Sequence, residues 1–325
     1  MRIWKHSPAD SLLLAFSVAQ LAVTIWLATE WLGASVWGWA AQVAGLAVLT
    51  AYNIIVVSHL FTHVPWFVSA KLNAVVSVLN SVNIGQSVQA YQLTHVRNHH
   101  RFNNDAKGED GTTKDTSSTY RDGEDGEHTP LLRYVLGGAW QSLVDRGREV
   151  LYFVRLWRVG SSEQNLLSLA SRREPRRSRE LRQIQVDRMA HVLVIPLFAV
   201  ISWQWTLAVY LPAWVIALAM VNVQNYYRHY GADPDDRSAD SVSYYGRLYN
   251  LLAFNDGYHQ EHHLSPATHW SQMPKVRERW RARLDARERI VSPVPAMLGF
   301  LDRRRPLLHR NEISDGPVRT DGGGS

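Results

Sequence analysis

The placement of histidine in this chain predicts its chemistry more clearly than any other feature. The sequence has 14 histidines and no cysteine, and nine of the histidines fall into four tight groups. These are His59 and His63 in HLFTH; His95, His99 and His100 in HVRNHH; His229 in NYYRHYG; and His259, His262 and His263 in HQEHH. Side chains four residues apart lie on one face of a helix. Paired histidines in such a group can therefore present ring nitrogens to one small volume.

The number and type of these side chains predict a metal site. Imidazoles without thiolates suit divalent iron, zinc, copper or nickel. Nine ligands are too many for one ion, so we expect two ions with four or five nitrogen ligands each. The lack of cysteine in the sequence excludes thiolate-bound iron–sulfur, rubredoxin-type and haem centres, and cysteine nucleophiles. Asp256 and Glu261 flank the last group and are candidates to hold its rings in orientation.

Long stretches without charged residues predict that the chain crosses a membrane. There are 19 such residues between Asp10 and Glu30, 40 between Glu30 and Lys71, and 39 between Arg188 and Arg228. A helix needs about 20 apolar residues to cross the hydrocarbon core of a bilayer. A cleaved signal peptide is the alternative for the first stretch, but a second span follows it almost at once. We expect two hairpins with four spans, near 10–30, 35–58, 189–206 and 207–227.

The distribution of lysine and arginine predicts the orientation. The expected turns near 30–35 and 202–206 contain neither residue. Short loops rich in Lys and Arg stay in the cytoplasm, so both termini and the histidine groups should lie there, in a bacterial-type inner membrane. The expected fold class is an all-α integral membrane protein. Four transmembrane helices in two hairpins carry a cytoplasmic helical cap, made of 59–188 and 228–319, which holds the histidine groups.

The remaining segments fill in that cap. Residues 72–94 are uncharged but rich in Asn and Gln, which are costly to bury in lipid, so a helix at the membrane interface is expected. Residues 101–129 should form a loop and 131–158 helices along the membrane surface. The arginine-rich segment 171–188 fits either contact with anionic lipid or a solvated helix. We expect one domain over 1–319, with 320–325 as a flexible tail or linker.

The histidine groups, in this order, resemble those of the membrane fatty acid desaturase and alkane hydroxylase superfamily. Its pattern is HxxxH or HxxxxH, then HxxHH or HxxxHH, then a later HxxHH, and the resemblance covers nearly the whole chain. It implies four long helices under a cytoplasmic cap, an apolar substrate tunnel and two iron ions. All nine grouped histidines become iron ligands by this resemblance. Asn225 matches an asparagine that can hold a water at an iron, and no catalytic residue beyond the metal centre is implied.

The match is mixed within that superfamily. HVRNHH has the spacing of the alkane hydroxylases, and NYYRHYG resembles their NYxEHYG signature, but Thr94 and Arg228 stand where that group has glutamates. HQEHHLSP and the HHRFNND…KDTSST run resemble desaturases. The resemblance therefore implies an oxidoreductase that uses dioxygen to desaturate a fatty acyl chain. Hydroxylation of an alkane or lipid, or decarboxylation of a fatty acid to a terminal alkene, remain as alternatives.

The expected partners follow from the same reasoning. The sequence has no cysteine for a ferredoxin or rubredoxin domain and no Gly-rich dinucleotide fingerprint, so two electrons must come from outside. A ferredoxin or rubredoxin with its reductase, docking on the basic cytoplasmic face, is expected. The bilayer, a fatty acyl or alkyl substrate and dioxygen complete the set, and nucleic acid is not expected. A divalent metal transporter is the distant alternative, but its ligands should lie near mid-bilayer.

Overall fold

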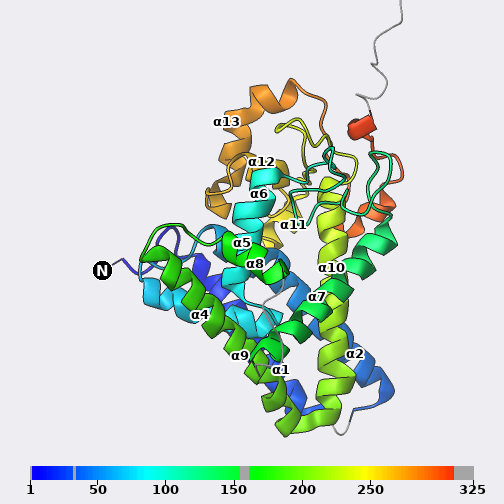
Figure 1. The fold of residues 1–325 in the computed structure, drawn as a ribbon. Coiled ribbons are helices and arrows are strands. Elements are labelled where there is room, and N and C mark those ends of the chain that lie inside the picture. Colours follow the sequence, from blue (N-terminus) through cyan, green and yellow to red (C-terminus); the bar gives the residue numbers. More distant parts are fainter. Residues whose placement is uncertain (1, 32–33, 154–160, 311–325) are drawn as a thin grey trace, which may run out of the picture.

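The computed structural model describes residues 2–31, 34–153 and 161–310, and the regular elements in these ranges are helices (Figure 1). Besides the helices, isolated bridges join Trp4 to Phe67 and Ser243 to Val291. The tail expected at 320–325 and the end of the expected cap, 311–319, lie outside the described residues. Three described segments are long and apolar enough to cross a membrane: Asp10–Glu30, Val36–His63 and Arg176–His229.

The first two of these segments match the first expected hairpin. Helix α1 spans Asp10–Glu30, and α2 spans Val36–Tyr52. Helix α2 runs directly on through η2 (Asn53–Ser58) into α3 (His59–His63), so the second span leads straight into the first histidine group. The Ser35 hydroxyl accepts a hydrogen bond from the Gly38 N–H and caps the start of α2.

The third segment folds back on itself. It comprises α9 (Arg176–Trp205), η4 (Thr206–Tyr210) and α10 (Leu211–His229). Ser202 leaves the helical conformation, with φ −160° and ψ 101°. Near this point the chain reverses at the lower end of the molecule, so α9 and α10 form two arms (Figure 1). The reversal falls at the expected turn, 202–206.

The uncharged segment 72–94 forms two helices, where one was expected. They are α4 (Ala70–Ile84) and α5 (Val88–Thr94), and α5 continues through η3 (His95–His99) into α6 (His100–Phe102). The break is at Gly85, whose φ is +67° and where a Cβ atom would lie 2.6 Å from Nε1 of Trp214. The Trp214 indole also donates to the carbonyl of Ile84, at 3.0 Å. Gly85 therefore ends α4 in the left-handed conformation, and Trp214 of the distant helix α10 packs against this turn.

The rest of the described chain forms the part that carries the histidines. Residues 103–130 contain neither helix nor strand, as predicted for a loop. Helix α7 packs against α10, α10 against α2, and α4 against α9. Residues 154–160 of the expected surface helices lie outside the described ranges. The elements here are α7 (Leu131–Phe153), α8 (Ser161–Ser168), α11 (Arg247–Leu252), α12 (His259–Leu264), η5 (Trp270–Gln272), α13 (Met273–Asp285), η6 (Ala296–Leu301) and η7 (Leu308–Arg310).

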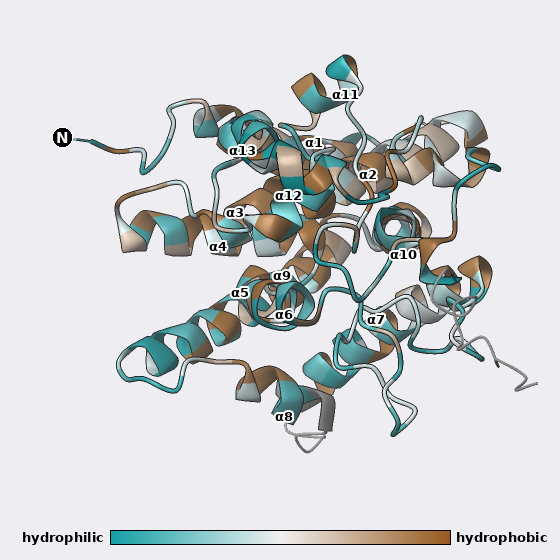
Figure 2. Ribbon diagram, turned by 90° about the horizontal axis from the view of Figure 1, so that it is seen from above, coloured by the Kyte–Doolittle hydropathy of each residue, from teal (hydrophilic) through white to brown (hydrophobic). Residues whose placement is uncertain are grey.

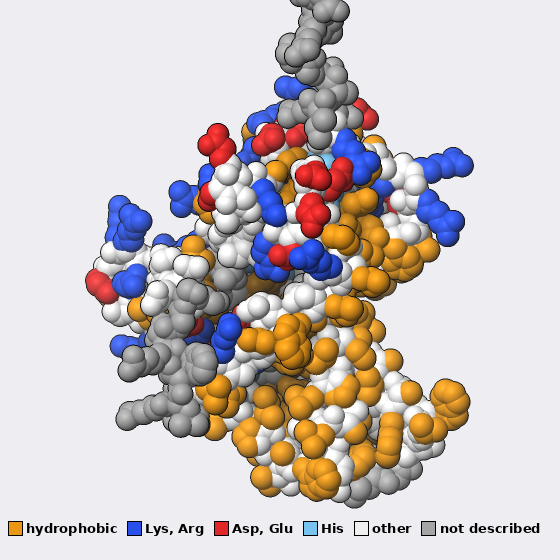
Figure 3. All heavy atoms as spheres, turned by 45° about the vertical axis from the view of Figure 1, so that its right-hand side comes forward, with side chains coloured by type: hydrophobic (Ala, Val, Ile, Leu, Met, Phe, Trp, Pro, Cys, Tyr) orange, Lys and Arg blue, Asp and Glu red, His pale blue; other side chains and the backbone are white. Residues whose placement is uncertain are grey.

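Side-chain types divide the molecule into two parts. On the face drawn in Figure 3, the lower part is hydrophobic or uncharged, and lysine, arginine, aspartate and glutamate gather in the upper part. A buried apolar core includes Leu13, Val57 and Trp66. A hydrogen-bonded chain crosses the helices: the Asn53 amide donates to Gln20 and its oxygen accepts from Ser58, both at 2.7 Å. Buried polar groups in an apolar bundle need such partners.

The arginine-rich segment forms the start of α9 and is partly paired within the protein. Glu180 accepts from Arg97 and Arg176, and the buried Arg188 lies between Glu149 and Glu163. Part of the positive charge of this segment is therefore neutralised, at Arg176 by its own Glu180 and at Arg188 by carboxylates of α7 and α8. The other arginines Arg172, Arg173, Arg177 and Arg179 are exposed or half-buried.

Candidate metal centre

The nine grouped histidines come together at the ends of four helical segments. Seen from above, α3, α6, α10 and α12 meet near the middle of the molecule (Figure 2). Two of the groups lie at the ends of candidate membrane segments: His63 is the last residue of α3 and His229 is the last residue of α10. The helical bundle thus delivers these side chains to one level, where η3, α6 and α12 add the others.

Five of the histidines form a first group. Each offers one ligand nitrogen, and these nitrogens lie within 4.8 Å of one another. The Nε2 atoms of His59 and His262 are 3.2 Å apart, as are those of His95 and His100. Nitrogens this close, from the four helical elements α3, η3, α6 and α12, can bind a single ion. The members are His59, His63, His95, His100 and His262.

A second group lies beside the first. It consists of His99, His229 and His263, whose ligand nitrogens also lie within 4.8 Å of one another. The two groups adjoin at His100 and His263, whose ring centroids are 4.7 Å apart. His259 belongs to neither group, but its Nε2 is 3.4 Å from Nε2 of His229. The structure therefore brings together all nine histidines that the spacing singled out.

The protonation of these rings suits metal binding. Burial, and next the neighbouring imidazoles, place the pKa of His95, His100 and His262 well below the usual value for histidine. Neutral imidazole, with a free lone pair, is the form that binds a metal.

Orphaned ring nitrogens test whether a metal fits. Buried polar atoms nearly always have a hydrogen-bond partner. Within the described ranges, several buried ring nitrogens have none: Nε2 of His63, Nε2 of His99, Nδ1 of His100 and both nitrogens of His263. Unpartnered nitrogens within two groups of converging imidazoles are what a metal would satisfy. The donor set, of nitrogen without sulfur, fits iron and other divalent ions.

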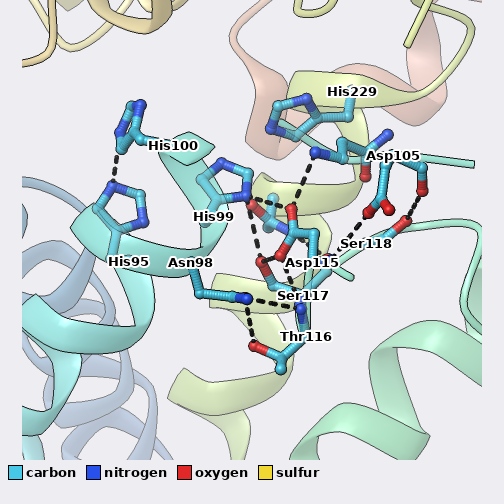
Figure 4. Close-up of polar contacts among 12 residues, drawn as sticks. His95, Asn98, His99, His100, Asp105, Asp115, Thr116, Ser117, Ser118 and His229 are labelled. Atoms are coloured by element: carbon cyan, nitrogen blue, oxygen red, sulfur yellow. Dashed lines mark hydrogen bonds and ion pairs between the residues drawn. The ribbon is translucent and has the colours of Figure 1, made fainter. Parts of the chain in front are cut away.

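Three aspartates lie behind the rings. Asp115 accepts from His99 Nδ1 at 2.6 Å, and from the backbone N–H of Asn104 and the hydroxyl of Ser117 (Figure 4). Burial alone would raise the pKa of Asp115, yet His99 and the bonds from His99 and Ser117 hold it below its usual value. The ionised carboxylate fixes the His99 tautomer with hydrogen on Nδ1, which leaves Nε2 for the centre.

Asp256 and Asp240 act on other rings. Oδ1 of Asp256 is 3.6 Å from Nδ1 of His59, and Oδ2 accepts from Arg228 and Tyr249. The backbone carbonyl of Asp240 is 3.1 Å from Nδ1 of His229. Its carboxylate is 3.7 Å from Nδ1 of His263, and burial raises its pKa to about 7.

The other two predicted site residues, Glu261 and Asn225, are hydrogen-bonded to groups other than the histidines. Glu261 accepts from the hydroxyls of Ser243 at 2.9 Å and Tyr245 at 2.5 Å. The Asn225 amide donates to the Tyr134 hydroxyl at 2.6 Å and to the carbonyl of Ser117 at 3.3 Å. Glu261 therefore anchors α12 to the segment before α11, and Asn225 joins the loop that carries Asp115.

Sequence reasoning missed Asp115 and Asp240. Asp115 lies in the KDTSST run that resembles desaturases, so that resemblance was the available signal. Asp240 follows α10 within a loop, at no spacing that distinguishes it from other acidic residues. A small pocket beside the first group was also unforeseen. It is lined by His59, His63 and His262, and by Leu60, Val64, Phe254, Asn255, Asp256, Thr268, Trp270 and Met273.

Comparison with known proteins decides the family. The family model described as fatty acid desaturase matches residues 37–293, which include all four histidine groups. The chain belongs to the fatty acid desaturase family. The family match and the three segments long and apolar enough to cross a membrane together indicate a membrane protein. The metal transporter that the histidine content also allowed is not supported.

A curated relative agrees with this assignment over a short stretch. A segment of 50 residues is 44% identical to a sphingolipid delta(4)-desaturase of Komagataella phaffii. The match covers 15% of this chain and 14% of that protein.

Proposed function

We propose that this desaturase-family protein uses dioxygen and two external electrons to introduce a double bond into a fatty acyl chain at a di-iron centre. The observation that carries the proposal is the pair of adjoining histidine groups with unpartnered ring nitrogens. Desaturation is preferred to hydroxylation or decarboxylation because the family, and the relative that matches over a short stretch, are both described as desaturases.

The histidines divide naturally between two ions. The five-membered group would hold one iron, and His99, His229 and His263, with His259 beside them, would hold the other. When bound, the iron ions supply the site for dioxygen and for the electrons that make it an oxidant. Overall, a –CH₂–CH₂– unit, O₂, two electrons and two protons give –CH=CH– and two waters. The aspartates behind His99 and His59 keep these rings aimed at the centre.

The same proposal includes four spans with a cytoplasmic centre. The segment Arg176–His229 would cross twice, because it reverses near Ser202. Both turns at the far end, near 30–35 and 202–206, lack lysine and arginine. The described cap and the termini would then face the cytoplasm, where a ferredoxin or rubredoxin with its reductase supplies the electrons.

The test is expression in a bacterial host with its own ferredoxins, followed by mass spectrometry of lipids and culture extracts. We expect acyl chains with one more double bond, and none from the His262→Ala variant. His6→Ala, at an exposed position outside both groups, is the matched control and should retain the product. A new alcohol or terminal alkene instead would assign a different reaction to the same centre. Iron-loaded protein with a competent donor and no oxidised lipid would contradict the proposal.

A further inference from the structure

Helix α11 combines an apolar exposed face with a direct connection to the histidines. Leu248, Leu251 and Leu252 are 70%, 75% and 61% exposed, at the i, i+3, i+4 spacing of a single helical face. Arg247, at the start of the helix, is also exposed. Exposed leucines on one face preceded by a basic residue are typical of helices that lie in the membrane interface. In Figure 2, α11 stands out from the perimeter beside the labels of α1 and α2.

Helix α11 is hydrogen-bonded to a candidate membrane helix. The Tyr52 hydroxyl donates to the carbonyl of Leu252, at 2.6 Å. Tyr52 belongs to the candidate membrane segment Val36–His63. It lies seven residues before His59, and at 1.5 Å per residue this is roughly 10 Å along the helix toward the bilayer. The end of α11 therefore contacts a candidate membrane helix directly, and its exposed leucines lie close to that helix.

The opposite face of α11 leads to the metal centre. The Tyr249 hydroxyl donates to Asp256 at 2.8 Å, and Asp256 lies behind His59. Asn250 donates to the carbonyl of Tyr244 and accepts from the N–H of Gly257. The helix is thus fixed to the centre on one side, with its leucines directed away on the other.

The turn after α11 forms part of the pocket wall. Phe254 and Asn255 both have positive φ, 51° and 61°. Residues other than glycine adopt this backbone conformation at a cost in free energy, and such turns are often found at functional sites. Both residues line the pocket that is also lined by His59, His63 and His262. The Phe254 ring packs edge-on against Trp270 of the same wall, with centroids 5.0 Å apart.

We propose that the leucine face of α11 is embedded in the cytoplasmic leaflet and holds the Phe254–Asn255 turn at the bilayer, where it forms the entrance for a membrane-dissolved lipid substrate. The inference rests on the proposed function for the substrate and for the cytoplasmic side of the bilayer, whereas the membrane contact itself is argued from the exposed leucines and the Tyr52 hydrogen bond. It assigns the substrate to acyl chains already in the bilayer, rather than to acyl groups on a soluble carrier.

The membrane contact is testable without enzyme activity. Because the sequence lacks cysteine, Leu251→Cys can carry a single environment-sensitive fluorophore in protein reconstituted into phosphatidylcholine–phosphatidylglycerol nanodiscs. Val48→Cys, at a 54% exposed position in α2, is the lipid control, and Glu278→Cys, exposed on α13, is the aqueous control. We expect doxyl lipids to quench position 251 about as strongly as position 48, and iodide to quench it several-fold less than position 278. Iodide quenching equal to that at 278 would overturn the proposal.

The entrance has its own readout. p-Benzoylphenylalanine placed at Phe254 should form photo-adducts with phospholipid acyl chains, detected by mass spectrometry of the purified protein. The same probe at Trp280, on α13, should give at most a small fraction of that yield. Equal yields, or none at 254, would contradict an entrance there. Neither assay requires turnover, so an inactive enzyme would count against the proposed function and leave these outcomes intact.

Discussion

Nδ1 of His99 lies 2.6 Å from Oδ2 of Asp115, and the two side chains are only 2% and 0% exposed. This contact joins a proposed metal ligand in a helix to a carboxylate in the irregular loop that follows it. The loop thereby belongs to the candidate metal centre, because the ionised carboxylate decides which nitrogen of His99 faces the other histidines.

Asp115→Asn should weaken that arrangement while keeping the size of the side chain. An amide can present its NH₂ group to His99 and favour the other tautomer, in which Nδ1 is the acceptor. We expect the affinity for iron and the rate of lipid oxidation to fall by about 10- to 100-fold. Plasma mass spectrometry should then show less iron retained by the purified variant, and product analysis less oxidised lipid. Asp110→Asn in the same loop, where Asp110 is exposed, is the control and should match the wild type. Wild-type iron content in Asp115→Asn would contradict the role given to this carboxylate.

Asp256 carries a different kind of contact, since its main partner is a buried arginine. Arg228 and Asp256 form an ion pair in which both side chains are nearly inaccessible to solvent. Removing one partner of such a pair leaves an uncompensated charge and costs about 3–5 kcal/mol. Asp256→Asn should therefore lower the thermal unfolding temperature of metal-free protein in detergent. Glu278→Gln, on the exposed face of α13, should leave it unchanged; equal unfolding temperatures for all three proteins would contradict this account.

Gly231 ends the turn that follows His229. Its φ is +85°, and a Cβ atom would lie 2.5 Å from the carbonyl oxygen of Pro306. Its N–H donates to Nε2 of His128, at 3.0 Å. Gly231→Ala should displace this turn, lower the expression of folded protein and reduce iron content. Gly126→Ala is a matched control, because Gly126 also has positive φ, +77°, but no atom within 4 Å of the added Cβ. If both variants lose iron equally, backbone strain alone accounts for the effect.

Much of the candidate centre could be predicted from sequence because its histidines follow helical spacing. His59 and His63, or His259 and His263, are four apart and must share a face. Charge-free length likewise predicted α1, the helix that leads from Val36 to His63, and the reversal near Ser202. These features depend on local periodicity and on the absence of charge over a stretch, which a single sequence displays directly.

The outer contacts of the centre could not be predicted in the same way. Asp115 is brought to His99 by a loop without periodicity, and Asp240 to His263 by another. Glu261 is adjacent in sequence to His262, but neighbouring helical positions point in different directions, and its partners are Ser243 and Tyr245. The packing of Trp214 against the turn at Gly85 likewise joins residues more than a hundred positions apart.

The metal content of purified wild-type protein tests the central claim most directly, by plasma mass spectrometry beside the His262→Ala variant. Two groups of converging imidazoles predict about two iron ions per chain in the wild type and a marked loss in the variant. One zinc ion per chain, unchanged by His262→Ala, would contradict the di-iron centre.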